Sequence, residues 1–71
     1  MSNQPAARFQ IGFVTANVWA NSSGDRTFYN VNVQRTYKDG GEYKQTDSLG
    51  HGDLMNAAKA LERAEAWIAQ Q

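Results

Sequence analysis

The chain has 71 residues, no cysteine, and seven basic against seven acidic side chains, so its formal net charge is zero. A domain this small buries only about 60% of its unfolded surface, and without cysteine it has neither disulfides nor cysteine-ligated zinc to stabilise it. We therefore expect it to be stabilised by association with a second copy, as a homodimer. The even charge balance counts against a strong non-specific binder of duplex DNA.

The N-terminal segment and the hydropathy pattern indicate no export and no membrane. No apolar run approaches the roughly 20 residues that cross a bilayer. Residues 1–7, MSNQPAA, lack the charged start and apolar centre of a signal peptide. We expect a disordered lead over residues 1–7, one domain over residues 8–71, and a cytoplasmic location.

Residues 9–20, FQIGFVTANVWA, have the alternation of extended chain, but its parity changes after Phe13. Such a change predicts two short strands or one strongly bent strand, with a bulge or kink at Gly12. Residues 21–25, NSSGD, are all turn formers and predict a turn.

A second long strand is predicted over residues 26–38, followed by a tight hairpin at KDGGE. We expect Tyr37 to pair with Tyr43 across this hairpin. That register would place Arg35 diagonally from Asp47, close enough for an ion pair.

From Gly50 the apolar residues recur at three- and four-residue spacing, as at Leu54, Leu61, Ala64 and Ile68, which predicts a helix. Gly50 is a suitable N-cap for it. The predicted fold is α+β: a four-stranded curved antiparallel sheet followed by one C-terminal helix that covers one sheet face.

Catalysis and metal binding have little support. His51 is the only histidine, in a GHGD segment typical of an exposed turn, and a single histidine without cysteine leaves too few ligands for a metal. We predict no enzyme activity, no cofactor and no small-molecule substrate.

The sheet face away from the helix has unusual chemistry, because amides and an aromatic ring alternate with the apolar residues of the long strand. An ordinary solvated face is one interpretation. Single-stranded nucleic acid is the other, since its bases stack on rings and meet amides at their edges. The candidate residues on this face are Phe28, Asn30, Asn32, Gln34 and Lys44, with Arg26 and Lys38 adding positive charge.

Two tryptophans have separate interpretations. Trp19 has the opposite parity from Val18, so it is either a stacking ring on the open side or a residue packed at a strand edge. Trp67 flanks the apolar stripe of the helix beside Ala60 and Ala64 and is a dimer or core residue; we assign these three residues to the dimer interface.

The segments FQIG, NSSG, YKDGGEYK and SLG, together with one terminal helix, resemble the transcriptional positive cofactor four family. The likeness extends from Phe9 to about Ile68 and lies closest to the family's bacterial and mobile-element members. It implies a homodimer that binds single-stranded DNA or RNA through outward-facing sheets, in transcription, replication or repair. Family members usually carry more lysine and arginine on these strands.

Two alternatives remain at this point. The same face, or an exposed sheet edge, could bind another protein without any nucleic acid. The open face could also simply join copies of the chain into a larger homo-oligomer.

Overall fold

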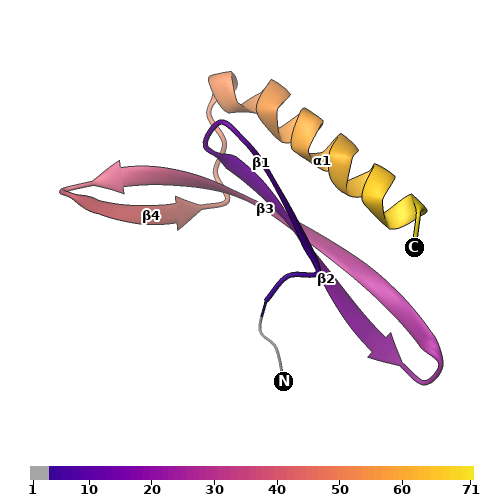
Figure 1. Ribbon diagram of the computed structural model, residues 1–71. Helices are drawn as coiled ribbons and strands as arrows, with labels where there is room; N and C mark the ends of the chain where they lie inside the picture. The colour runs from indigo at the N-terminus through magenta and orange to yellow at the C-terminus, as the bar shows by residue number, and fades with distance from the viewer. Residues whose placement is uncertain (1–3) are drawn as a thin grey trace.

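The computed structural model describes residues 4–71 (Figure 1). Four strands form one sheet in the order β1-β2-β3-β4, and all neighbours are antiparallel. The elements are β1 Ala7–Ile11, β2 Val14–Ser23, β3 Arg26–Asp39, β4 Glu42–Thr46, a short 3-10 helix His51–Asp53, and α1 Leu54–Ala69. The prediction of an α+β fold with a four-stranded antiparallel sheet and one C-terminal helix is confirmed.

All three strand connections are two-residue hairpin loops whose first loop residue is glycine with positive φ: Gly12 at 60°, Gly24 at 65° and Gly40 at 60°. Glycine adopts this conformation without steric cost, and it matches the twist of the flanking strands. The parity change after Phe13 therefore marks a hairpin between two strands, and the predicted bulge or kink at Gly12 is wrong. The turn predicted over residues 21–25 is also too long, since β2 continues to Ser23.

The structured domain starts slightly earlier than expected. β1 begins at Ala7, one residue before the predicted domain boundary, and the Ala6 N–H donates a hydrogen bond to the Val18 carbonyl oxygen at 2.7 Å. The disorder predicted for residues 1–3 lies outside the described residues.

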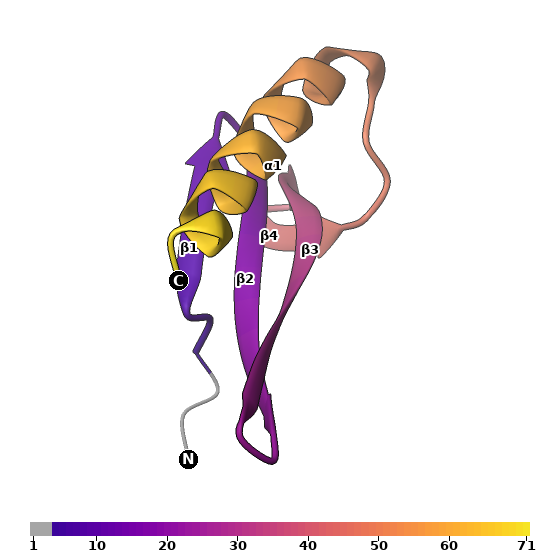
Figure 2. The ribbon, with the colours of Figure 1, turned by 90° about the vertical axis from the view of Figure 1, so that its right-hand side faces the viewer.

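The helix packs on the sheet through alanines. Ala57, Ala60 and Ala64 are buried on one side of α1, and Ala60 and Ala64 contact Ala16 and Val18 of β2. Small side chains on both surfaces let the helix approach the strands closely, at little cost in helix propensity. Figure 2 shows α1 lying across β1 and β2 on one side of the sheet.

Two further contacts fix the ends of the helix. In the last turns the Trp67 ring meets the Tyr29 ring of β3 edge to face, with centroids 5.6 Å apart. In the first turns Asn56 lies against the β1–β2 loop, where a side chain at Gly12 would stand 2.8 Å from Asn56 Nδ2. The helix is thus fixed to β3 at one end and to the first hairpin at the other.

Large parts of the sheet extend beyond the helix. The outer halves of β2 and β3 project on one side and the β3–β4 hairpin on the other (Figure 1), giving an elongated molecule of 45 × 27 × 14 Å. Among the described residues no helix is both long enough and apolar enough to cross a membrane.

Because the alanines contact the sheet, a larger side chain should destabilise the protein on the buried side of α1 but not on its exposed side. Ala60→Leu should lower the free energy of unfolding by about 1–3 kcal/mol, because the extra atoms must force the helix from the sheet. The matched change on the exposed side of the helix, Ala66→Leu, should alter it by less than about 0.5 kcal/mol. Urea denaturation of both variants measures the difference, and equal effects would contradict the packing described.

Candidate nucleic-acid interface

The sheet has one face that the helix does not cover, which we call the open face. Its members follow from the strand pairing, because directly opposed residues lie on the same side and alternate residues on opposite sides. Val14, Ala16 and Val18 of β2 face the helix. The open face is therefore formed by Arg8 and Gln10 of β1; Thr15, Asn17, Trp19, Asn21 and Ser23 of β2; the even residues 26–38 of β3; and Tyr43 and Gln45 of β4.

Amides occupy the middle of the open face in cross-strand rows. Asn17 lies opposite Asn32, and its Nδ2 donates a hydrogen bond to Asn32 Oδ1 at 3.3 Å. In the next row Gln10 and Gln34 lie on either side of Thr15. Thr15 is buried, and its hydroxyl has no hydrogen-bond partner among the described residues. The cross-strand bond orients the two asparagines, leaving an amide donor and a carbonyl acceptor for a ligand.

Aromatic rings lie at both ends of this amide region. Trp19 is half-buried on the open face opposite Asn30, and Phe28, which is 48% exposed, is its diagonal neighbour. Trp19 also lies one residue beyond Val18, the last residue of β2 that pairs with β1, so it is both on the open face and beside an unpaired edge of β2. Diagonal neighbours lie about 7–8 Å apart, within reach of large side chains. At the other end, Tyr43 lies opposite Lys38, whose ammonium is 5.9 Å from the Tyr43 ring centroid.

The electrostatics of the chain are uneven although its net charge is zero. Arg8, Arg26 and Lys38 occupy open-face positions, and none of them forms an ion pair with a described residue. No strand position on the open face holds an acidic residue. The carboxylates lie in the β2–β3 loop (Asp25), on the opposite side of the β3–β4 hairpin (Asp39, Glu42), after β4 (Asp47), and in the helices (Asp53, Glu62, Glu65).

The predicted pairing of β3 with β4 is wrong by one residue. Tyr37 lies opposite Lys44 and not opposite Tyr43, because Gly40 and Gly41 both have positive φ and form a two-residue loop. This shift moves Lys44 to the opposite side of the hairpin, where its Nζ lies 3.3 Å from Asp39 Oδ2. Lys44 is therefore not part of the open face, and Tyr43 is.

The shift also changes the partner of Arg35. Its Nε lies 3.4 Å from Asp53 Oδ2 and donates a hydrogen bond to the Ser48 carbonyl oxygen at 3.2 Å. The expected pair with Asp47 is not formed. Asp53 also accepts a hydrogen bond from the Gly50 N–H at 3.0 Å, so one carboxylate caps the start of the helical segment and holds it to β3.

Two of the three residues assigned to the dimer interface are buried in the core of the chain. Ala60 and Ala64 are fully buried against the sheet and cannot reach a second subunit, so their interface role is corrected to a core role. Trp67 is half-buried against Tyr29. His51 is exposed in the 3-10 helix, and residues 4–71 contain no cluster of three potential metal-ligating side chains.

Several open-face residues were missed from the sequence. Arg8 alternates with Phe9 in the first strand, as Gln10 does. This alternation alone places the Arg8 side chain on the sheet side away from the apolar residues of that strand. Asn17 has the same parity as Trp19, so the alternation with Ala16 and Val18 also places it on the open side. Tyr43 required the register, which follows from two consecutive glycines that favour a two-residue loop.

Comparison with known proteins identifies no family and no function for this chain. No family model, curated protein or solved structure matches this chain.

The Arg35 contact gives a paired test of the observed register. Asp53→Ala should lower the free energy of unfolding by about 1 kcal/mol, because it removes both the cap and a partly exposed ion pair. Asp47→Ala, at the partner expected from the sequence, should have almost no effect. Thermal denaturation of the two variants separates them, and a larger loss for Asp47→Ala would contradict this register.

Proposed function

We propose that this chain binds single-stranded nucleic acid, most simply single-stranded DNA, through its open face. The observation that carries the proposal is the separation of charge: within residues 4–71, three cations without an ion pair lie on a face whose strand positions hold no carboxylate. Affinity for nucleic acid comes largely from cations near phosphates and the release of counterions. A neutral protein can meet this requirement if its cations share one surface.

The remaining chemistry of the open face fits an unpaired strand better than a duplex. The exposed ring of Phe28 and the half-buried ring of Trp19 offer surfaces on which any base can stack, and stacking needs bases that are not already paired. The asparagine and glutamine side chains between the rings can donate to and accept from base edges. In a duplex, the faces of the bases are stacked on one another and their pairing edges are hydrogen-bonded, so neither is accessible to such a surface.

The resemblance to the transcriptional positive cofactor four family supports the same function. The order of four strands and one C-terminal helix is the one that the resemblance implies. A role in transcription, replication or repair, in a bacterial or mobile-element setting and in the cytoplasm, follows from that resemblance as part of this proposal.

A homodimer is the second part of the proposal, and surface area supports it. The chain has 5405 Å² of accessible surface, whereas a folded monomer of this mass has roughly 4,400 Å². Part of the excess lies on the projecting hairpins. The helix also exposes Leu54, Met55 and Leu61, between 43% and 79% of each side chain. A typical interface buries about 800 Å² on each partner, which is within this excess.

One observation favours the alternative of a protein-binding module. β4 pairs only with residues 35–39 of β3, so the remainder of β3 has a strand partner on one side alone. Such an edge can accept an added strand from another protein. Binding of that kind depends on backbone hydrogen bonds and should change little with salt.

Salt dependence of binding distinguishes the two functions. Fluorescence anisotropy with labelled oligo(dT) should show binding that weakens steeply between about 50 and 200 mM salt, and weaker binding to a matched duplex. Arg8→Ala should reduce the magnitude of the salt slope by about 0.7, the value expected for one phosphate contact to a single strand.

The matched control is Lys44→Ala, which removes a cation paired with Asp39 on the opposite side. It should leave affinity and slope unchanged. Absence of binding at low salt, or equal losses for Arg8→Ala and Lys44→Ala, would contradict the proposal. Light scattering of the same samples reports a dimer, a monomer or a larger homo-oligomer.

A further inference from the structure

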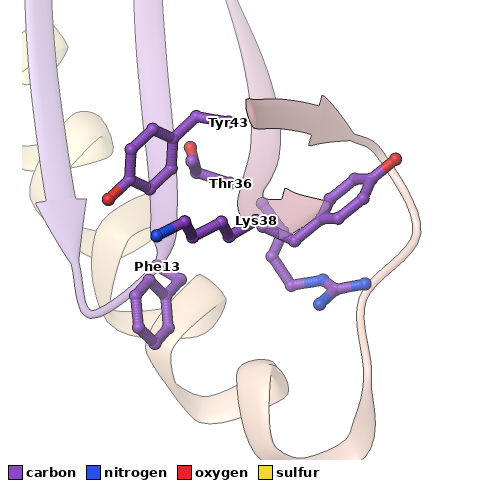
Figure 3. A pocket seen from close by; sticks show the side chains of 6 residues that line it. Phe13, Thr36, Lys38 and Tyr43 are labelled. Carbon is purple, nitrogen blue, oxygen red and sulfur yellow. The ribbon is translucent and has the colours of Figure 1, made fainter. Parts of the chain in front are cut away.

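The β3–β4 end of the molecule has a cavity of about 270 Å³ with an unusual lining (Figure 3). Its lining residues are Phe13, Arg35, Thr36, Tyr37, Lys38 and Tyr43. Phe13 is 69% exposed and Tyr43 is 76% exposed. Neither ring belongs to the core, and a two-residue hairpin loop has no need of phenylalanine at its second position.

The main chain that carries each of these exposed rings is fixed by backbone pairing. Phe13 follows Gly12 in the first hairpin loop, and the Thr36 N–H of β3 donates a hydrogen bond to the Phe13 carbonyl oxygen at 2.9 Å. Tyr43 comes from a different hairpin and pairs directly with Lys38, two residues after Thr36. Two hairpins therefore present their rings over the same short segment of β3.

A cation lies with these rings. Figure 3 shows the Lys38 side chain extending between the Tyr43 and Phe13 rings, and its Nζ is 5.9 Å from the Tyr43 centroid. Lys38 has no carboxylate partner among the described residues, in contrast to Lys44. Two flat apolar surfaces beside one unpaired ammonium match a ligand that has both a planar ring and a negative charge.

We infer that Phe13, Tyr43 and Lys38 form a base-binding subsite, which takes one unpaired nucleobase against the two rings and its neighbouring phosphate on the Lys38 ammonium. This inference rests on the proposed function and names a second stacking position for it. The first position, Trp19 with Phe28, lies near the other end of the open face. Base pairing must be absent at the subsite, because a base within a duplex cannot reach the rings.

The two stacking positions set the length of strand that binds. Phe28 and Lys38 are ten residues apart on β3, which corresponds to at most about 33 Å along the strand. An oligonucleotide that reaches both stacking positions should bind more tightly than one that reaches a single position, so affinity should increase with length and then level off within roughly 4–16 nucleotides. In a variant that lacks the subsite, affinity should level off at a shorter oligonucleotide length.

Substitutions at the rings test the subsite directly. Phe13→Ala and Tyr43→Ala should each weaken oligo(dT) binding by roughly 5- to 160-fold, the range for loss of one stacked base. Tyr43→Phe keeps the ring and should bind like the unaltered protein. Lys44→Ala, which removes a side chain from the opposite side of the same hairpin, should also have no effect. Circular dichroism confirms that each variant is folded.

An oligonucleotide without bases separates stacking from charge. The unaltered protein should bind an abasic strand of equal length more weakly than oligo(dT), while Phe13→Ala and Tyr43→Ala should show a smaller difference between the two strands. If both variants bind oligo(dT) normally while Arg8→Ala still weakens binding, the subsite is refuted and the proposed function stands. If the unaltered protein binds no single strand at low salt, the proposed function itself fails.

Discussion

The contact between the alanines of α1 and the small residues of β2 is the constraint on which the rest of the structure depends. Ala60 and Ala64 let α1 lie close against Ala16 and Val18, so a core with few large side chains can still exclude water. The consequence of this arrangement is that α1 covers only part of the sheet. One helix of 16 residues shields part of one sheet face, and the other face remains in solvent.

An uncovered face must be polar enough to stay soluble, but solubility alone does not explain what is found there. Charged residues of both signs would be sufficient, as on most protein surfaces. Instead the open face has amides, exposed rings and cations, while every carboxylate lies elsewhere. Because cations and carboxylates lie on different surfaces, a chain with no net charge has one surface suited to a polyanion. The charge balance of the whole molecule is therefore a poor guide to the potential at one surface.

The fold could be predicted from sequence because periodicity defines each element: alternation up to the third hairpin, and three- and four-residue spacing after Gly50. The register of the last hairpin could not, since pairing Tyr37 with Tyr43 brings two aromatic rings together and only the loop geometry decides against it. That single-residue difference exchanged Lys44 for Tyr43 on the open face and Asp47 for Asp53 beside Arg35. Short-range patterns thus gave the elements, whereas the candidate site depended on backbone conformation at two glycines.

The side-chain amide signals in NMR spectra test most directly whether the open face binds a single strand, because the open face and the ends of the helix each carry asparagine and glutamine side chains with separate signals. On addition of oligo(dT), we predict shifts in the NH₂ resonances of Asn17, Asn32 and Gln34 on the open face. The NH₂ resonances of Asn56 and Gln70, at the two ends of the helix, should stay in place. Shifts confined to Asn56 and Gln70, or none at all at saturating oligonucleotide, would contradict an open face that binds a single strand.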